Sequence, residues 1–152
     1  MPYVEDIQPG TTRQLGQYTV TRDEILAFAR DWDPQPFHTD EETEAFDGLI
    51  ASGWHTTSIF MRLYVDAYLH DGAGRASPGV DELRWSTPVR PGDTLTASLT
   101  EERIMPSLSQ RDRAIVAQDC ELANQHGEAV LSMRLHTILL RRDADRPAAE
   151  TA

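Results

Sequence analysis

The segment from Gly53 to about Leu69 constrains the fold most, because apolar side chains lie on every face of the helix that it predicts. These side chains are Trp54, Ile59, Phe60, Met61, Leu63, Tyr64, Val65, Ala67, Tyr68 and Leu69. A helix that is apolar all round is usually buried in a core instead of lying on a surface. Such a helix needs other elements to cover it, and the rest of the chain must supply them.

Four segments after the predicted helix have the composition and length of strands. They are residues 80–85, 94–104, 113–123 and 129–140. Turn sequences such as Arg90-Pro91-Gly92-Asp93 and Asn124-Gln125-His126-Gly127 separate them. Long consecutive strands joined by short turns favour an antiparallel meander. We therefore predict an α+β fold in which an antiparallel sheet wraps one long central helix.

The N-terminal part of the chain predicts a strand and then a helix. Residues 13–20 have strand composition, and Thr21 and Glu24 have the spacing of a capping box, so we expect Thr21 to cap a helix. Pro34 ends that helix, because the residue before a proline is disfavoured in helical φ/ψ. A second capping-box spacing, over residues 39–42, predicts a short acidic helix.

Length and charge limit the classes of protein to consider. The 152 residues fit one domain over 1–142, followed by a frayed polar tail at 143–152. The net charge of −11 argues against a nucleic-acid partner, whose phosphates would be repelled. All 14 basic residues are Arg, so neither a Schiff-base lysine nor a phosphate-loop lysine is present.

The sequence also carries signals of location. No run of about 18 apolar residues predicts a membrane span, and the acidic N-terminus lacks the apolar stretch of a secretory signal. Cys120 is the single cysteine, which excludes a disulfide within the chain and suits a reducing compartment. We expect a cytoplasmic protein that does not interact with membranes.

Chemistry-bearing residues cluster before the central helix. Asp33 and His38 lie five positions apart on a segment with two prolines, where a carboxylate and an imidazole can share proton transfer with a water molecule. Gly53 begins the helix, where free backbone N–H groups can hold a developing negative charge. The apolar neighbours Trp32 and Phe37 would raise the pKa of the Asp33 carboxyl.

Simpler interpretations of the same residues remain open. Asp33 can be a helix-terminating residue and His38 a solvated turn residue, since short spacings have high false-positive rates. A metal site that uses these two residues with Asp31 and Asp40 is a second alternative, although it lacks the paired His or Cys spacing of zinc sites. His55 is more typical of a packed histidine than of a catalyst. No G-x-S-x-G elbow for a serine hydrolase is present.

Three stretches together carry a family resemblance that covers most of residues 10–140. They are Asp33-Pro34-Gln35-Pro36-Phe37-His38, Gly48-Leu49-Ile50-Ala51-Ser52-Gly53-Trp54-His55-Thr56 and Trp85-Ser86-Thr87-Pro88-Val89-Arg90-Pro91-Gly92-Asp93. The sequence resembles the MaoC-like dehydratase family, which includes the R-specific enoyl-CoA hydratases. The resemblance implies a hotdog fold that forms a homodimer or a higher homo-oligomer.

The resemblance also implies roles for individual residues. Asp33 and His38 match the catalytic pair of the family motif, and Gly53 matches the glycine that supplies an oxyanion N–H. Two positions depart from the family pattern: Gln35 stands where Asn is usual, and Ser52 stands where His often precedes the glycine. The implied activity is reversible addition of water to a 2-enoyl thioester, converting an enoyl-CoA to an (R)-3-hydroxyacyl-CoA. No cofactor or metal is implied, because coenzyme A enters as part of the substrate.

Substrate contacts are expected from residues beside the catalytic positions. The expected substrate-binding residues are Gln35, Ser52, Trp54 and Arg84. Further candidates for the coenzyme A phosphates are Arg90, Arg111 and Arg113, and the loop at 71–79 is a candidate wall of the acyl pocket. Two other functions stay open: a hotdog domain that binds an acyl thioester or another small ligand without reaction, and an acyl-CoA thioesterase with Asp66 as its carboxylate.

Overall fold

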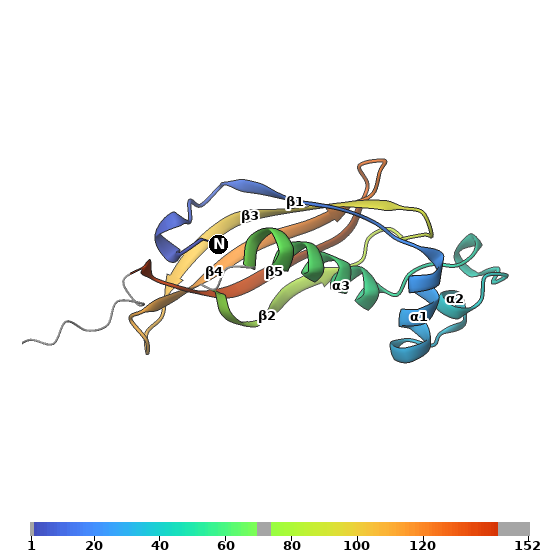
Figure 1. Ribbon diagram of the computed structural model, residues 1–152, viewed down its shortest axis with the longest axis horizontal. Helices are drawn as coiled ribbons and strands as arrows, with labels where there is room; N and C mark the ends of the chain where they lie inside the picture. The colour runs from blue at the N-terminus through green and yellow to red at the C-terminus, as the bar shows by residue number, and fades with distance from the viewer. Residues whose placement is uncertain (1, 70–73, 143–152) are drawn as a thin grey trace, which may run out of the picture.

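A single curved antiparallel sheet and a central helix form the body of the protein (Figure 1). The computed structural model describes residues 2–69 and 74–142. In chain order the elements are a 3₁₀ turn Val4–Asp6, β1 Thr12–Thr19, α1 Arg22–Trp32, α2 Pro36–Thr39, a 3₁₀ turn Ala45–Asp47, α3 Gly53–Tyr64, a π-helical turn Val65–Leu69, β2 Gly74–Arg84, β3 Thr94–Pro106, β4 Arg113–Ala123 and β5 Ala129–Leu140. The predicted α+β fold is confirmed.

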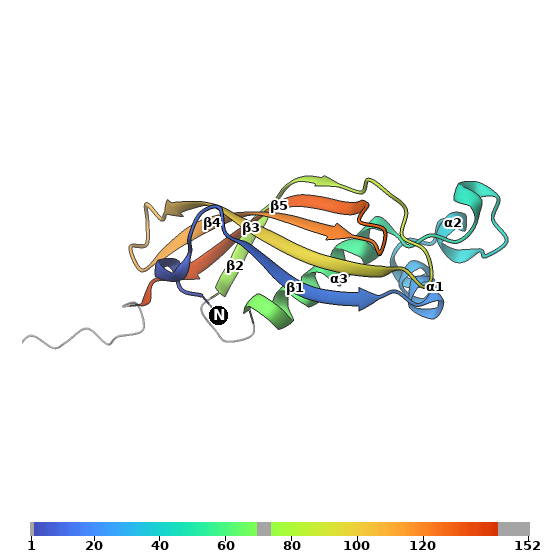
Figure 2. The same ribbon diagram turned by 90° about the horizontal axis from the view of Figure 1, so that it is seen from above.

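The five strands have the order β1-β3-β4-β5-β2, and every neighbouring pair is antiparallel. The meander predicted for the last three strands is confirmed. Strand β2 pairs with β5 alone, so it is one edge of the sheet, and β1 is the other. Seen from above, the sheet twists strongly along its length while α3 runs beneath it (Figure 2).

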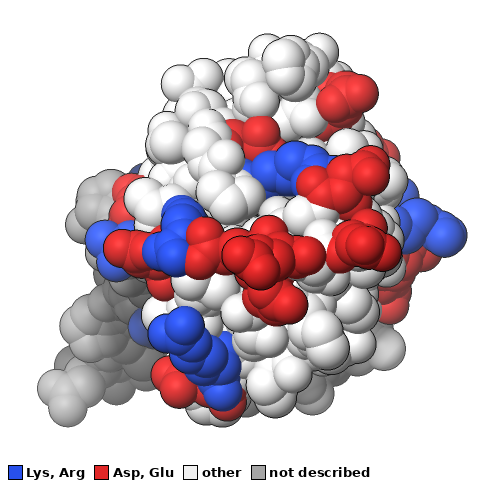
Figure 3. All heavy atoms as spheres, turned by 90° about the vertical axis from the view of Figure 1, so that its right-hand side faces the viewer, with Lys and Arg blue, Asp and Glu red and all other residues white. Residues whose placement is uncertain are grey.

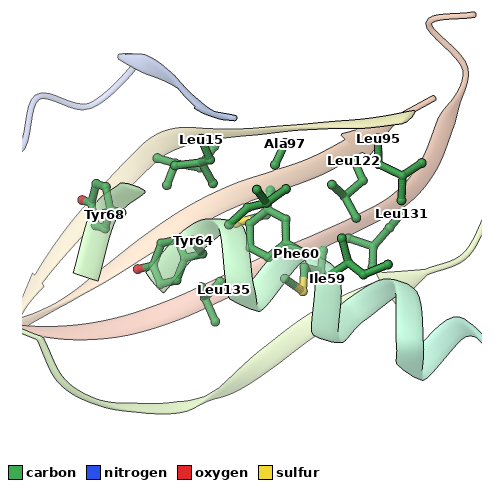
Figure 4. Close-up of a cluster of buried hydrophobic side chains, with 14 of the residues drawn as sticks. Leu15, Ile59, Phe60, Tyr64, Tyr68, Leu95, Ala97, Leu122, Leu131 and Leu135 are labelled. Atoms are coloured by element: carbon green, nitrogen blue, oxygen red, sulfur yellow. The ribbon is translucent and has the colours of Figure 1, made fainter. Parts of the chain in front are cut away.

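Helix α3 packs its inner side against the sheet, and this contact forms the core (Figure 4). Phe60 and Tyr64 are 0% and 1% exposed, and they meet the inward-facing strand residues Leu95, Leu122 and Leu135. The alternating burial along β3 and β5 reflects the two faces of each strand, one turned to the helix and one to solvent.

The prediction that α3 is buried on every side is wrong. Its outer side leaves Trp54 58% exposed, Met61 40% exposed and, at the start of the π-helical turn, Val65 39% exposed. The reason is geometric, because one sheet covers only one side of a helix. The apolar outer side of α3 therefore remains uncovered in the single chain.

Two further predictions about local structure are corrected. The capping box at 39–42 does not start a helix, because Thr39 instead closes the short helix α2 and donates from Oγ1 to the carbonyl of Gln35 at 3.1 Å. The loop expected at 71–79 is strand β2 from Gly74 onward. Residues 71–73 of that loop and the predicted tail at 143–152 lie outside the described residues.

Helices α1 and α2 lie beyond the end of the sheet, next to the N-terminus of α3 (Figures 1 and 2). Thr21 caps α1 as predicted, with its Oγ1 accepting from the Glu24 N–H at 3.3 Å. This arrangement brings the C-terminus of α1, helix α2 and the first turn of α3 together. The predicted catalytic residues come from these three segments.

Candidate active site

The segment between α1 and α2 positions the carboxylate and the imidazole. Asp33 is the C-cap of α1, with φ −150° and ψ 69°, and its N–H still donates to the carbonyl of Ala29 at 2.9 Å. Pro36 is the first residue of α2, where its missing N–H costs no hydrogen bond. His38 lies on this four-residue helix and is 5% exposed. The predicted rigid connector is therefore residues 33–35.

The structure brings Asp33 and His38 together, and His38 is not the solvated turn residue of the simpler interpretation. The His38 Nε2 lies 3.4 Å from the Asp33 Oδ2. On the other side of the ring, Nδ1 lies 2.8 Å from the carbonyl oxygen of Ile50. Because a carbonyl can only accept, Nδ1 carries the proton in the neutral imidazole, and Nε2 then has a free lone pair. The bare Nε2 and a carboxylate oxygen thus converge on one point.

Two side chains hold the Asp33 carboxylate in place. The Ser52 hydroxyl donates to Oδ2 at 2.7 Å, and the Gln35 amide donates to Oδ1 at 2.7 Å. The hydrogen bond from Ser52 lowers the pKa of Asp33 below its usual value, and burial opposes this shift. The hydrogen bond from Gln35 and the charge that His38 carries when it is protonated add to the lowering. The carboxylate is therefore ionised at neutral pH.

This result corrects one expectation from the sequence. Trp32 is 77% exposed, so it does not provide the apolar surroundings that were expected to raise the pKa of Asp33. Gln35 and Ser52, the expected substrate contacts, each donate to Asp33. The two departures from the family pattern thus place an amide and a hydroxyl on the same carboxylate.

Gly53 is the first residue of α3, and Ser52 is its N-cap. The Ser52 Oγ accepts from the Trp54 N–H at 3.2 Å while it donates to Asp33. Among the described residues, no acceptor pairs with the Gly53 N–H, as is usual in the first turn of a helix. A free donor at the positive end of the helix dipole is suited to a developing oxyanion.

A side chain at position 53 would collide with Trp85. An added Cβ would lie 2.4 Å from Cδ2 and 2.5 Å from Cε2 of the indole ring. The ring is held by a hydrogen bond from its Nε1 to the Thr57 Oγ1 at 3.2 Å and by an edge-to-face contact with Trp54 at 5.2 Å. Glycine at this position is therefore required for the close approach of the indole to the helix.

A cavity of about 270 Å³ opens between this helix N-terminus and residues 85–89, which follow β2. His38, Gly53 and Thr56 supply its polar side. The remaining lining residues are Phe46, Ile50, Ala51, Trp85, Ser86, Thr87, Pro88, Val89 and Val130. Sequence reasoning missed Phe46 and Val130, for which no local pattern signals a role. Trp85 to Val89 lie in the third stretch of the family resemblance, which was a usable signal.

The loop beside the cavity has an unusual backbone. Phe46 and Asp47 have φ values of 55° and 57°, in the left-handed region that a non-glycine residue rarely adopts. The Arg90 guanidinium donates to the carbonyl oxygens of both residues, at 3.3 Å for Asp47. Of the arginines expected to bind coenzyme A, Arg90 is thus the one next to the cavity, and it fixes the loop that carries Phe46.

The structure does not bring the other predicted substrate residues into the cavity. Trp54 is exposed and contacts the cavity only through Trp85. Arg84 lines a separate hollow of about 390 Å³ formed with residues of strands β3, β4 and β5. Arg111 is exposed in the turn before β4, and Arg113 forms a two-pronged pair with Asp112 at 2.8–2.9 Å.

The surroundings of the site are acidic. Carboxylates gather on the end of the molecule that carries α1 and α2, with arginines among them (Figure 3). The exposed acidic residues of this region are Asp23, Asp31, Asp40, Glu41, Glu42, Glu44 and Asp47. Such a face repels a polyanion, so the phosphates of a coenzyme A substrate would have to lie away from these carboxylates.

A metal centre has no counterpart in the described chain. Within residues 2–69 and 74–142, no three His, Cys, Asp or Glu side chains gather as a metal-binding group. Asp40, one of the ligands of the metal alternative, instead accepts from the Glu42 N–H at 2.9 Å. Burial raises the pKa of the Cys120 thiol to about 12, so this cysteine stays protonated. No helix in the described part is long and apolar enough to cross a bilayer.

Comparison with known proteins agrees with this geometry. The MaoC like domain matches residues 6–119. The structure of the MaoC-like dehydratase from Rhodospirillum rubrum is 41% identical with a TM-score of 0.87, and the match covers 93% of this chain and 99% of that one. The (R)-specific enoyl-CoA hydratase of Rhodospirillum rubrum is 31% identical over 112 residues, 68% of this chain and 72% of that protein. The uncharacterised protein YdeM of Bacillus subtilis is 34% identical over 79 residues, 50% of this chain and 56% of its own length, so this chain covers little more than half of that relative.

The fold and its neighbours define the class of protein. An antiparallel sheet of five strands around a central helix is the hotdog fold, and the solved structures with this fold include the MaoC-like dehydratase named above. The chain belongs to the MaoC-like family, since the family's domain matches most of its length.

Proposed function

We propose that this protein reversibly adds water to the double bond of a 2-enoyl-CoA to give an (R)-3-hydroxyacyl-CoA. The observation that carries the proposal is the ionised Asp33 carboxylate facing the Nε2 of His38, next to the unpaired N–H of Gly53. The 31% identity to a protein named (R)-specific enoyl-CoA hydratase supports both the reaction and its stereochemistry.

The geometry of the pair suits activation of one water molecule. Two acceptors 3.4 Å apart, the Asp33 Oδ2 and the His38 Nε2, can each accept one hydrogen of the same water. As the water oxygen bonds to C3 of the substrate, one of the two groups takes its proton. A proton is then returned from the pair to C2, so the product gains the elements of one water and both groups return to their starting state.

Gly53 would stabilise the charge that develops during this step. Addition at C3 moves electrons onto the thioester oxygen, which becomes enolate-like. A hydrogen bond from the Gly53 N–H to that oxygen is the type of interaction whose loss costs about 2.7–4 kcal/mol in other enzymes. The apolar lining from Ile50, Val89 and Val130 suits the acyl chain. Coenzyme A enters as part of the substrate, and the steps use no other cofactor.

The direct test is loss of the enoyl thioester absorbance in a panel of enoyl-CoAs that starts with crotonyl-CoA. Asp33→Asn and His38→Gln should each lower kcat at least 10²-fold, because each replaces a group that can take up and return a proton with an amide that cannot. Asp31→Asn is the matched control, since this exposed carboxylate two positions earlier makes the same chemical change outside the site. Wild-type turnover in either site variant would refute the mechanism.

The same panel separates the two other candidate functions. A binding domain would show calorimetric binding of an enoyl-CoA with no loss of absorbance. A thioesterase would release free thiol from a saturated acyl-CoA. Asp66 is a poor candidate for that activity, because it lies in the π-helical turn beyond the end of α3 and its carboxylate pairs with Arg62 at 2.7 Å.

We further propose that the active form is a homodimer joined through the β2 edge and the outer side of α3. Strand β2 has one unpaired edge. Large apolar side chains are also exposed on β2, on α3 and just beyond their ends, at Trp54, Met61, Val65, Val80 and Trp85. Exposed strand edges and contiguous apolar patches favour association. Because Trp85 also lines the cavity, the second copy would complete the surroundings of the site.

Sedimentation measurements test the dimer. Val80→Glu places a charge on the edge strand and should convert the dimer to a monomer at micromolar concentration. Leu108→Glu is the control, because Leu108 is fully exposed in the turn after β3 and lies outside β2 and α3. A wild-type protein that remains a monomer at all concentrations would exclude this interface.

A further inference from the structure

His55 is a buried histidine that the proposed reaction does not use. It lies in the first turn of α3, three positions after Ser52, and is 7% exposed. Its ring stacks on Phe28 of α1, with ring centroids 4.8 Å apart and planes 9° apart. The histidine thus contacts α1 from the same turn of α3 that carries Ser52 and Gly53.

A carboxylate of α1 faces the same ring. The His55 Nε2 lies 3.6 Å from the Glu24 Oε1. Both Glu24 Oε1 and His55 Nδ1 are buried, and neither has a hydrogen-bond partner among the described residues. The other oxygen of Glu24 is occupied, since it accepts from the Thr21 hydroxyl at 2.7 Å. A proton on Nε2 therefore points to Oε1, and the Tyr18 hydroxyl is a second donor near this carboxylate.

The charges around this pair indicate a neutral imidazole. Burial lowers the pKa of His55, while the Glu24 carboxylate opposes the shift. A cation in the first turn of a helix is also disfavoured by the helix dipole. Tyr18 faces Glu24 from β1, where burial and then the carboxylate raise the pKa of its hydroxyl. At neutral pH the His55–Glu24 contact is thus between a neutral imidazole and a carboxylate. We therefore treat this contact as one that positions a helix and not as one that transfers protons.

These contacts give α1 two points of attachment to the first turn of α3. At the C-terminus of α1, Asp33 accepts from the Ser52 hydroxyl at 2.7 Å. Nearer the start of α1, Phe28 and Glu24 meet His55. Two points fix the orientation of a helix, whereas one point leaves it free to pivot.

We propose that Glu24 and His55 are a positioning pair that holds α1 against the first turn of α3 and thereby keeps the Asp33 carboxylate on the Ser52 hydroxyl. The inference rests on the proposed function only in treating Asp33 as a catalytic group. The pair joins the same two segments that the hydrogen bond from Ser52 to Asp33 joins, so it acts through these two residues.

The pair has a measurable consequence at Asp33. Ser52, Gln35 and His38 face this carboxylate, and the hydrogen bond from Ser52 is the largest cause of its lowered pKa. If α1 pivots, this hydrogen bond lengthens and the pKa of Asp33 rises toward the ordinary carboxyl value of about 3.9. Loss of overall stability alone would leave the pKa in the folded protein unchanged.

The test is a ¹³C NMR titration of the Asp33 carboxyl, assigned by its absence in Asp33→Asn, together with kcat and KM on an enoyl-CoA. His55→Leu keeps an apolar group against Phe28 but removes the partner of Glu24. We expect a higher pKa for Asp33 and a kcat about 10-fold lower with KM unchanged, since small misplacement of a catalytic group acts on the chemical step.

The Glu24 variants test the other member of the pair. Glu24→Gln keeps an acceptor, so the pKa of Asp33 and kcat should stay at their wild-type values. Glu24→Ala removes the acceptor, so the pKa of Asp33 should rise and kcat should fall. His126→Ala, an exposed histidine in the turn before β5, is the control.

Measurements in the Ser52→Ala background show whether His55 changes the pKa of Asp33 through the hydrogen bond from Ser52. In that background, His55→Leu should produce no further change in the pKa of Asp33, because the hydrogen bond it supports is already absent. An unchanged pKa in folded His55→Leu, or an equal shift in both backgrounds, would overturn the proposal. If His55→Leu does not fold, Glu24→Ala gives the same test at a side chain that is 24% exposed. The titration needs no substrate, so an inactive protein would refute the proposed function and leave this result interpretable.

Discussion

Gly53→Ala adds one methyl group at the most crowded point of the site. The new Cβ would lie 2.4 Å from the nearest atom of Trp85, whereas ordinary contact begins at 3.4 Å, so the indole must move by about 1 Å. The ring is 45% exposed and can tilt outward. An extra methyl in a packed site costs about 1–3 kcal/mol of stability, and we expect a value near 1 kcal/mol here.

The larger effect should be on activity. Trp85 and Gly53 both line the cavity, so the displaced ring changes where the thioester lies relative to the Gly53 N–H. A misplacement of about 1 Å can cost about 10²-fold in rate. We therefore expect kcat/KM to fall about 10- to 100-fold, while the free energy of unfolding falls by only about 1 kcal/mol.

A double-mutant cycle tests this reasoning. Enoyl-CoA hydration and urea unfolding are measured for the wild type, Gly53→Ala, Trp85→Ala and the double variant. If the collision is the cause, Gly53→Ala should have almost no effect on either quantity once the indole is absent. An equal loss of activity in both backgrounds would show that the alanine acts on the helix itself, and the steric explanation would be wrong.

Three other predictions follow from the geometry. Glu101 is fully buried and accepts from Arg13 at 2.9 Å and Tyr68 at 3.0 Å, so Glu101→Ala should lower the free energy of unfolding in urea by about 1–3 kcal/mol, because it leaves the buried Tyr68 hydroxyl without its acceptor while the partly exposed Arg13 is rehydrated. Arg90→Ala should raise KM for the enoyl-CoA several-fold and leave kcat nearly unchanged, since it releases the loop with positive φ beside the cavity. The lowered pKa of Asp33 adds stability above the unfolded-state value of about 3.9 that is lost as pH falls through the folded-state pKa. The stability difference between the wild type and Asp33→Asn, from urea unfolding at several pH values, should therefore shrink in acid, and a constant difference would contradict this prediction.

Local patterns were sufficient to predict most of the elements. The strand at 13–20, the Thr21 cap and the three long strands lie within about two residues of β1, α1, β3, β4 and β5. Their alternation and turn residues are properties of neighbouring positions, which a sequence displays directly. The prediction of a helix at 39–42 was wrong because capping-box spacing shows only where a helix can begin. In the structure Thr39 is the last residue of α2, and its hydroxyl donates to the carbonyl of Gln35 instead of capping a new helix.

Within the site, the sequence by itself determined the types of group and their approximate order. Asp33 and His38 are close in the chain, which made them candidates for a shared site, but their spacing alone also fitted a helix terminator and a solvated turn residue. The position of Gly53 at the start of a predicted helix marked it as a candidate N–H donor, and the family resemblance favoured the catalytic interpretation of all three. The role of Ser52 could not be predicted, because it lies 19 positions from Asp33 and only the packing of α1 against α3 joins them at 2.7 Å. That contact, together with Gln35, decided that the Asp33 carboxylate is ionised, reversing the direction expected from its apolar neighbours.

Tertiary structure also decided which predicted residues belong to the site. Arg84 and Trp85 are adjacent in the sequence, yet Trp85 lines the cavity while Arg84 lines a separate hollow. The apolar character of residues 53–69 determined that a central helix exists, but only the single-layer sheet decided which side of it stays exposed. Side-chain type is fixed by the sequence, whereas burial, neighbours and therefore pKa depend on which distant segments the fold brings together.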